Sequence, residues 1–321
     1  MIPLLKKMFS GDRAALARLI THVESRSPEM AKIMAQVEPK AGKAQVLGVT
    51  GPPGAGKSTL VDQIITQYRK KGKKIGVVAV DPSSPFSGGA LLGDRIRMMG
   101  HVEDPDVFIR SLGSRGAHGG LSRATRDVVR LFDAFGMDLV IVETVGVGQT
   151  ELDVLDVAQT TVVVLTPESG DTIQTLKAGL LEAADIFVVN KADREGAHRI
   201  HQELLAMIEM GKGSGIKANE GWEIPVLQVQ ANLGKGVDAL CQMVDRHLEW
   251  VVQSEVHRKK QERIRLEEFR EVIEEMLQVQ LKEALSQNAS LKTVRDEVKE
   301  GKQNPFEAAL EIQKRLKLTV S

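Results

Sequence analysis

The chain has 321 residues, 42% of them apolar, and this length supports one large domain with appendages or two domains. Its 43 basic and 43 acidic side chains cancel, so the charge gives no sign of a nucleic-acid or membrane-surface partner. The only cysteine, Cys241, excludes an internal disulfide framework, and no apolar run reaches the ~18 residues of a membrane span, so we expect a soluble protein of the reducing cytoplasm.

Residues 1–42 carry helical signals. Apolar residues recur there at spacings of three and four: Leu16, Leu19, Ile20 and Val23. Ser27 and Pro28 indicate a new helix start, because serine can cap a helix and proline can open one. We therefore predict an N-terminal extension of two or three short amphipathic helices.

Residues 43–253 alternate strand-like apolar runs with helix-like segments. The predicted strands cover residues 45–50, 74–80, 106–111, 138–143, 160–166, 185–190 and 225–230. Runs separated in this way are typical of an α/β domain with a mostly parallel sheet and helices on both faces. Right-handed crossovers then place the loops that follow the strands along one edge, where ligands bind.

Residues 254–321 have no strand signal. An apolar stripe recurs at spacings of three and four: Phe269, Val272, Ile273, Met276, Leu277, Leu281 and Leu285. The residues NPFE, at 304–307, predict a capped start for a last helix that ends near Leu316. Because the stripe must be buried, either on the chain's own domain or in a dimer, we interpret this zone as a C-terminal helical dimerisation arm.

The first predicted strand leads into GPPGAGKST at residues 51–59, which matches G-x-x-x-x-G-K-[ST] and precedes a predicted helix. In such a loop the backbone N–H groups surround phosphate oxygens, Lys57 reaches the β and γ phosphates, and Ser58 ligates Mg²⁺. We predict that the nucleotide contacts Gly51, Pro52, Pro53, Gly54, Ala55, Gly56, Lys57, Ser58 and Thr59.

Carboxylates near the ends of other predicted strands are candidates for the metal. Asp81 ends the second strand, Asp94 lies in the loop after it, and Glu143 ends the strand at 138–143. Mg²⁺ takes few protein oxygens and keeps several waters, so Asp81 or Asp94 serves directly or through water. We expect the strand that ends at Glu143 to lie beside the first strand, so that Glu143 faces Mg²⁺ and the γ-phosphate.

The segment NKAD at residues 190–193 ends a later strand and matches N-K-x-D through Asn190, Lys191 and Asp193. A carboxylate can accept two hydrogen bonds from N1–H and the exocyclic amine of guanine, and adenine offers no such pair. The backbone at Ala231 and Asn232, after the last strand, is expected to meet the guanine carbonyl. We therefore predict GTP and GDP, rather than ATP, as substrate and product.

The motifs together resemble the MeaB family of GTPases, also called the ArgK or LAO/AO transport family. Five stretches carry the resemblance in this order: GVTGPPGAGKSTL, AVDPSSPFSGGALLGDRIRM, ETVGVGQTE, SGDTIQTLKAGLLE and NKAD. The resemblance covers residues 45–240 closely and implies a P-loop NTPase of the SIMIBI class, usually a homodimer with helical extensions. It further implies a chaperone for adenosylcobalamin-dependent acyl-CoA mutases, usually methylmalonyl-CoA mutase, which gates cofactor delivery and protects the mutase from inactivation.

The resemblance also implies roles for individual residues. Its positions fall in four groups: Lys57, Ser58 and Thr59 at the phosphates and metal; Asp81 and Asp94 in the first switch; Glu143 and Gly146 in the second; Asp171, Gln174 and Lys177 in a third, at 169–182. The last group approaches the nucleotide when the mutase binds. Candidate catalytic residues are therefore Lys57, Glu143, Asp171, Gln174 and Lys177.

We predict slow GTP hydrolysis that a bound mutase accelerates, through positioning and electrostatics rather than a general base, with Lys177 meeting the developing charge. One alternative is a P-loop kinase or ATPase linked to basic amino-acid transport. Another is a non-catalytic nucleotide-gated scaffold for a different partner. A nickel metallochaperone is disfavoured, because such a role usually needs a Cys and His cluster and the chain has one cysteine.

Overall fold

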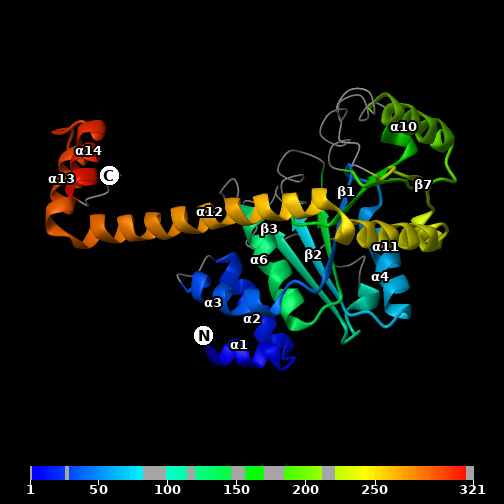
Figure 1. Cartoon of the computed structure of the whole chain (residues 1–321), viewed down its shortest axis with the longest axis horizontal. Coiled ribbons are helices and arrows are strands. Elements are labelled where there is room, and N and C mark those ends of the chain that lie inside the picture. Colours follow the sequence, from blue (N-terminus) through cyan, green and yellow to red (C-terminus); the bar gives the residue numbers. More distant parts are fainter. Residues whose placement is uncertain are drawn as a thin grey trace. The chain divides into compact units, whose positions relative to one another are not determined.

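The computed structural model describes residues 2–25, 29–81, 99–113, 120–144, 146, 156–169, 184–211 and 221–315. It divides into two compact units, residues 1–256 and residues 257–321. In the first unit a sheet is covered by helices on both faces (Figure 1). No helix in the described ranges is apolar over enough of its length to cross a membrane.

Seven strands of the described residues form one sheet, in the order β3-β2-β4-β1-β5-β6-β7, with every neighbouring pair parallel. The strands are β1 (Gln45–Thr50), β2 (Ile75–Asp81), β3 (Val107–Gly113), β4 (Leu139–Thr144), β5 (Thr160–Leu165), β6 (Ile186–Val189) and β7 (Val226–Gln228). All seven predicted strands are confirmed, with ends that differ by at most two residues. The predicted α/β fold with a parallel sheet is also confirmed. The apolar runs predicted it because strands that are buried on both faces consist mostly of apolar residues.

The described helices of the first unit precede the sheet, connect its strands or follow its last strand. They are α1 (Ile2–Phe9), α2 (Arg13–Glu24), α3 (Met30–Val37), α4 (Lys57–Lys70), α6 (Gly120–Phe135), α10 (Ala197–Gly211) and α11 (Val237–Gln253). Alternate strand residues point to opposite faces: Leu47 packs with α4 and α11, whereas Val46 packs with α6 and the N-terminal helices. On the same face as α6, α10 covers β5 and β6.

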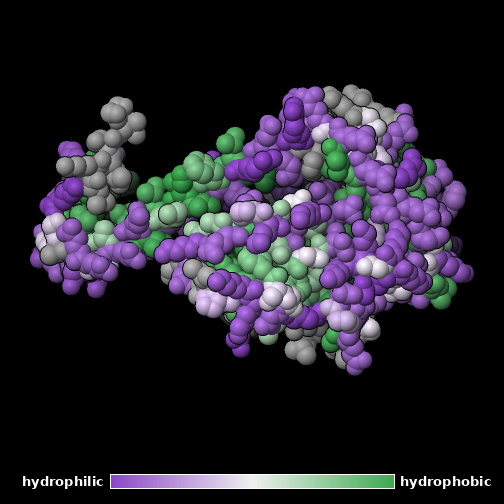
Figure 2. Space-filling model, turned by 60° about the horizontal axis from the view of Figure 1, so that its bottom comes forward, coloured by the Kyte–Doolittle hydropathy of each residue, from purple (hydrophilic) through white to green (hydrophobic). Residues whose placement is uncertain are grey.

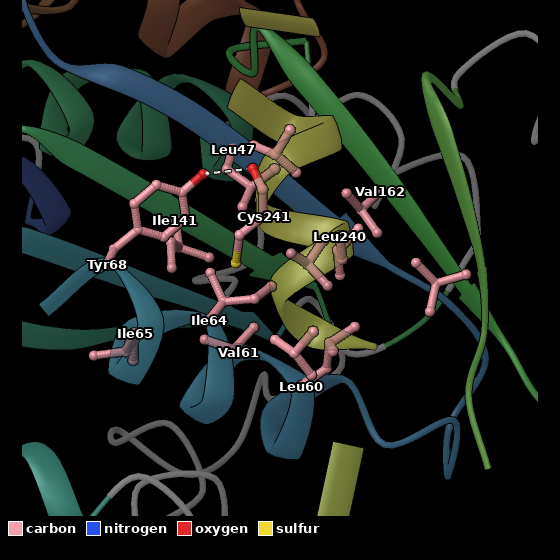
Figure 3. Packing of buried hydrophobic residues seen from close by; sticks show 14 of the residues in the cluster. Leu47, Leu60, Val61, Ile64, Ile65, Tyr68, Ile141, Val162, Leu240 and Cys241 are labelled. Carbon is pink, nitrogen blue, oxygen red and sulfur yellow. Dashed lines mark hydrogen bonds between the residues drawn. The ribbon is translucent and has the colours of Figure 1, made fainter. Parts of the chain in front are cut away.

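A polar clamp of Tyr68, Lys71 and Asp245 joins α4 to α11 at the edge of their shared core. The Tyr68 hydroxyl donates to Asp245 Oδ1 at 2.7 Å. It also lies 3.4 Å from the Cys241 carbonyl oxygen, the contact drawn in Figure 3. Lys71 Nζ holds the other oxygen of Asp245 at 2.6 Å. Cys241 is buried as part of this core, and burial raises the pKa of its thiol to about 12. The clamp fixes α11 against α4, the helix that begins directly after the glycine-rich loop.

The N-terminal helices are anchored to the edge of the sheet. Arg13 donates to the Val107 carbonyl oxygen at 2.7 Å and its guanidinium lies 5.0 Å from the centre of the Phe108 ring. Arg110 pairs with Glu24 at the end of α2. These helices complete the core on the α6 face, and the predicted helix start at Ser27 and Pro28 lies outside the described residues.

The second unit is helical. It contains most of α12 (Glu255–Gln287), then α13 (Ala289–Lys299) and α14 (Pro305–Arg315). The helices α13 and α14 contact each other, and Leu291, Val294 and Ala308 are buried. The predicted start of α14 is confirmed, because Asn304 Oδ1 accepts from the Phe306 N–H at 2.8 Å. Along α12, Figure 2 shows apolar side chains at the surface, and several large ones are exposed: Leu266, Phe269, Ile273, Met276, Leu277, Val279 and Leu281.

Candidate nucleotide-binding site

The glycine-rich loop lies between β1 and α4, in the strand, loop and helix arrangement that the motif predicts. Gly51 lies against β5, where a Cβ atom would approach the Val164 carbonyl oxygen to 2.1 Å. Gly56 has φ +83°, and a Cβ atom there would lie 2.5 Å from Asn190 Nδ2. Larger residues at either position would therefore displace the loop.

Lys57 lies across the mouth of this loop. It is the first residue of α4 and is only 6% exposed. Its ammonium donates to the carbonyl oxygens of Gly51 at 2.7 Å and Pro52 at 3.0 Å. A buried charge is tolerated when hydrogen-bond acceptors surround it. The two carbonyl oxygens therefore hold the Lys57 ammonium at the start of the glycine-rich loop.

Ser58 and Glu143 meet at the end of the sheet. The parallel register of β1 with β4 pairs Val49 with Glu143, which confirms that the two strands are neighbours. The Ser58 hydroxyl donates to Glu143 Oε1 at 2.6 Å, and both side chains are buried. Hydroxyl and carboxylate oxygens are hard ligands of the kind Mg²⁺ prefers, so this pair fits the ion.

The other predicted metal ligands are less defined. Asp81 is the last residue of β2, two positions beyond Ala79, which lies level with Glu143, so its backbone reaches the same edge. Its side chain, and all of Asp94, lie outside the described residues. Across the described part of the chain, no three or more His, Cys, Asp or Glu side chains gather as a metal-binding group. An ion at Ser58 and Glu143 would then be held largely by phosphate and water oxygens.

Two threonines that the motif analysis missed complete this edge. The Thr144 hydroxyl lies 2.8 Å from the Thr50 hydroxyl, which in turn donates to the Gly146 carbonyl oxygen at 2.8 Å. Both threonines are fully buried. Each threonine is the last residue of an apolar strand, and threonine is common in strands. The sequence therefore gives little indication of their role beyond a hydroxyl next to the glycine-rich loop, for Thr50, or next to Glu143, for Thr144.

Asn190 joins two loops. Its Nδ2 donates to the Ala55 carbonyl oxygen at 2.8 Å, and its Oδ1 accepts from the Ala231 N–H at 3.1 Å. The side chain is 3% exposed. One amide group therefore ties the glycine-rich loop to the loop that follows β7, two segments that the sequence assigned separately to phosphate and to guanine.

The rest of the N-K-x-D segment faces outward. Lys191 has φ +56° and is half-buried, whereas Asp193 and Asn232 are exposed. An exposed carboxylate beside a buried amide can accept hydrogen bonds from a ligand without disturbing the core. The segment thus places an exposed carboxylate next to a buried, hydrogen-bonded amide.

Glu168 connects this segment to the region after β5. It lies in the short helical turn Pro167–Ser169 and forms an ion pair with Arg194, while Lys191 Nζ is 4.0 Å away. The Arg194 guanidinium holds the pKa of Glu168 down at about 2. The predicted third switch begins here, but Asp171, Gln174 and Lys177 lie outside the described residues.

Comparisons with known proteins identify the family of this chain. Residues 16–286 match the model of a family described as methylmalonyl Co-A mutase-associated GTPase MeaB. A putative GTPase of Pyrococcus horikoshii is 46% identical over 88% of this chain and 89% of its own length. The methylmalonic aciduria type A homolog of Mus musculus is 36% identical over 72% of this chain and 59% of its own length.

A solved structure gives the same fold. The crystal structure of an LAO/AO transport system kinase is 27% identical, with a TM-score of 0.65 and coverage of 98% of this chain and 97% of that one. It agrees with the P-loop architecture of a parallel sheet with helical ends. Because the match to this family of GTPases spans most of the residues, and the relatives carry the name GTPase, this chain belongs to the MeaB family and is a P-loop GTPase.

Proposed function

We propose that this GTPase is a switch that acts as a chaperone for an adenosylcobalamin-dependent acyl-CoA mutase, with methylmalonyl-CoA mutase as the first candidate. The observation that carries the proposal is the match of residues 16–286 to a family described as associated with that mutase. In this role the GTPase gates cofactor delivery and protects the mutase from inactivation. The mouse relative, which is named after methylmalonic aciduria, supports the same client.

In this proposal the triphosphate of GTP binds to the loop at residues 51–59. Backbone N–H groups and the start of α4 surround the phosphates, and Lys57, already held at the mouth of the loop, reaches the β and γ oxygens. Ser58 and Glu143 would hold Mg²⁺, with Asp81 or Asp94 as a further ligand directly or through water. When bound, the ion supplies positive charge beside the phosphates.

Hydrolysis depends on positioning rather than on a strong base. Lys57 offsets charge that develops on the phosphate oxygens, and the Gly146 N–H meets the γ-phosphate, so that loss of this phosphate releases the second switch. Asp171, Gln174 and Lys177 form the partner-sensitive group, and Lys177 adds positive charge when the mutase is bound. Turnover is therefore slow without the partner.

Guanine is read by the exposed carboxylate of Asp193, with the backbone at Ala231 and Asn232 at the carbonyl side of the base. Lys191, in the same segment as Asp193, is half-buried. Asn190 supports the reading edge through its two hydrogen bonds rather than by exposure to the base. Discrimination against adenine follows because an unmatched acid loses its partners on binding.

The chain acts as a homodimer in this proposal, through the apolar residues of α12. A side chain such as Phe269 is 64% exposed on a helix that carries many charges, and a second copy of this helix would bury it. The cytoplasm is the proposed location.

The direct test is a binding and turnover experiment with purified methylmalonyl-CoA mutase. Immobilised GTPase is loaded with a non-hydrolysable GTP analogue, with GDP or with no nucleotide, and retained mutase is measured. We expect retention of the mutase to depend on the bound nucleotide. We also expect GTP turnover to rise at least about tenfold when mutase is added, because a positive charge brought to the phosphates by a partner typically accelerates hydrolysis by more than this. Lys177→Ala should remove this rise.

The same assay separates the alternatives. If the mutase is not retained and does not stimulate GTP turnover, this mutase is excluded as the client. Transfer of phosphate to a small molecule, in place of free phosphate, would favour the kinase function that the related LAO/AO structure carries in its name.

A further inference from the structure

Two buried threonine hydroxyls form a short hydrogen-bonded chain that ends on Gly146. Thr50 is the last residue of β1 and Thr144 the last residue of β4, and both have 0% exposure. The Thr144 and Thr50 oxygens are 2.8 Å apart, and the Thr50 oxygen is 2.8 Å from the Gly146 carbonyl oxygen. The Thr144 oxygen is itself 3.1 Å from the same carbonyl.

The protons of this chain can be assigned. Each hydroxyl has one proton, and the Gly146 carbonyl can only accept. Thr50 therefore donates to Gly146, and Thr144 donates to Thr50 over the shorter of its two contacts. If one hydroxyl is removed, the other still lies within reach of the carbonyl, so the two threonines back each other up.

Packing alone does not account for threonine at these positions. The neighbouring residues Val49 and Val142 are fully buried and apolar. Valine has nearly the shape of threonine without the hydroxyl, and burying a hydroxyl is unfavourable unless it is hydrogen-bonded. The hydroxyls thus act on what they bond to, and the end of the chain of bonds is the backbone of Gly146.

We infer that Thr50 and Thr144 are positioning residues that set the second switch for GTP. The inference rests on the proposed function, in which the Gly146 N–H meets the γ-phosphate. Glycine has wide conformational freedom, so an unrestrained Gly146 would have to be ordered when GTP binds. Fixing its carbonyl in advance removes part of that ordering from the binding step. GDP has no γ-phosphate, and its binding gains nothing from this restraint.

The test is nucleotide selectivity of the full-length Thr50→Val/Thr144→Val variant. Affinities for fluorescent GDP and for a fluorescent non-hydrolysable GTP analogue are measured by titration with Mg²⁺ present. We expect affinity for the GTP analogue to fall roughly 3- to 10-fold, the range of one lost net hydrogen bond, while GDP affinity stays within about twofold. Because each hydroxyl backs up the other, the single valine variants should each lose less than about threefold.

Two variants control for simple loss of stability. Thr50→Ser/Thr144→Ser keeps both hydroxyls and should retain the selectivity of the native protein. Thr160→Val removes a different buried hydroxyl of the same sheet, which lies 2.8 Å from His247 Nδ1. This variant should unfold more easily but bind both nucleotides with unchanged selectivity.

An unchanged ratio of GTP-analogue to GDP affinity in the double valine variant, an equal loss of both affinities, or tighter binding of the GTP analogue would overturn the inference. If the double variant does not fold, Thr50→Val decides, since it removes the 2.8 Å bond to Gly146 and leaves only the 3.1 Å contact. Its ratio of GTP-analogue affinity to GDP affinity, measured on the same preparation, should still fall by about twofold, and an unchanged ratio would overturn the inference. Failure of the native protein to bind guanine nucleotides with Mg²⁺ would instead refute the proposed site.

Discussion

Replacement of Asn190 by alanine should weaken the fold and the nucleotide site together. The amide of Asn190 makes two hydrogen bonds, one to the Ala55 carbonyl oxygen and one from the Ala231 N–H, and it is 3% exposed. The backbone of Asn190 stays in place in the variant, because its N–H donates to the Leu165 carbonyl oxygen at 2.8 Å. The substitution therefore removes the link between two loops and leaves the strand that carries it.

The magnitude follows from the groups left behind. Alanine leaves one buried carbonyl and one buried N–H without their partner, at a cost of ~1–3 kcal/mol each. Water that enters the space left by the removed amide recovers part of this cost, so we expect the free energy of unfolding to fall by about 2–4 kcal/mol. That is a large share of the ~5–15 kcal/mol typical of a folded domain, and the variant should still fold.

Urea denaturation without nucleotide measures this cost, since a bound ligand would add its own stabilisation. Titration with fluorescent GDP then measures the effect on binding. Asp193→Ala is the matched control: its carboxylate is exposed, so stability should stay within about 0.5 kcal/mol while guanine binding weakens. If Asn190→Ala unfolds at the same urea concentration as the native protein, the amide does not hold the loops together and the reasoning is wrong.

Three further predictions use other parts of the chain. Cys241, buried and with its thiol pKa raised to about 12, should resist iodoacetamide at about pH 8 until the protein unfolds, and alkylation of the native protein at the denatured rate would contradict this. Glu168 has its pKa lowered from 4.5 to about 2 by Arg194, so any advantage in unfolding free energy over Glu168→Gln should hold above about pH 4.5 and vanish toward pH 2, as urea unfolding across pH can check. Phe269→Asp on α12 should convert the proposed dimer to a monomer in light scattering, with Arg263→Gln, at an exposed position of the same helix, as a control for an equal change of one charge unit.

The fold was predictable because its main signal is local. The strands at the centre of the sheet are buried on both faces, so each appears as an unbroken apolar run, as in Leu139–Thr144. The expected proximity of Glu143 to the first strand also holds in the register with Val49. It was predictable because a parallel sheet with right-handed crossovers allows few positions for a strand whose end carries an acid.

The contacts inside the site were not predictable in the same way. Thr50 and Thr144 are separated by 94 positions, and their hydroxyl contact exists only because β1 and β4 are neighbours. Asn190 was assigned to guanine from its motif, yet both polar ends of its side chain bond to backbone groups of other loops. Motif spacing identifies which residue types are needed, whereas their bonding partners depend on tertiary structure.

In the proposed site, the bridge at Asn190 couples the loop assigned to phosphate with the loop assigned to the base. Gly56 allows the contact, since a Cβ atom there would lie 2.5 Å from Asn190 Nδ2 and push the amide away from Ala55. A ligand that orders the loop at Ala231 therefore favours the arrangement of the glycine-rich loop that Asn190 also holds. Coupling between two sites is reciprocal in binding free energy, so phosphate binding must favour the guanine loop by the same amount. Asn190→Ala should thus lower the coupling, so that the gain in affinity from GMP to GDP becomes smaller in the variant than in the native protein.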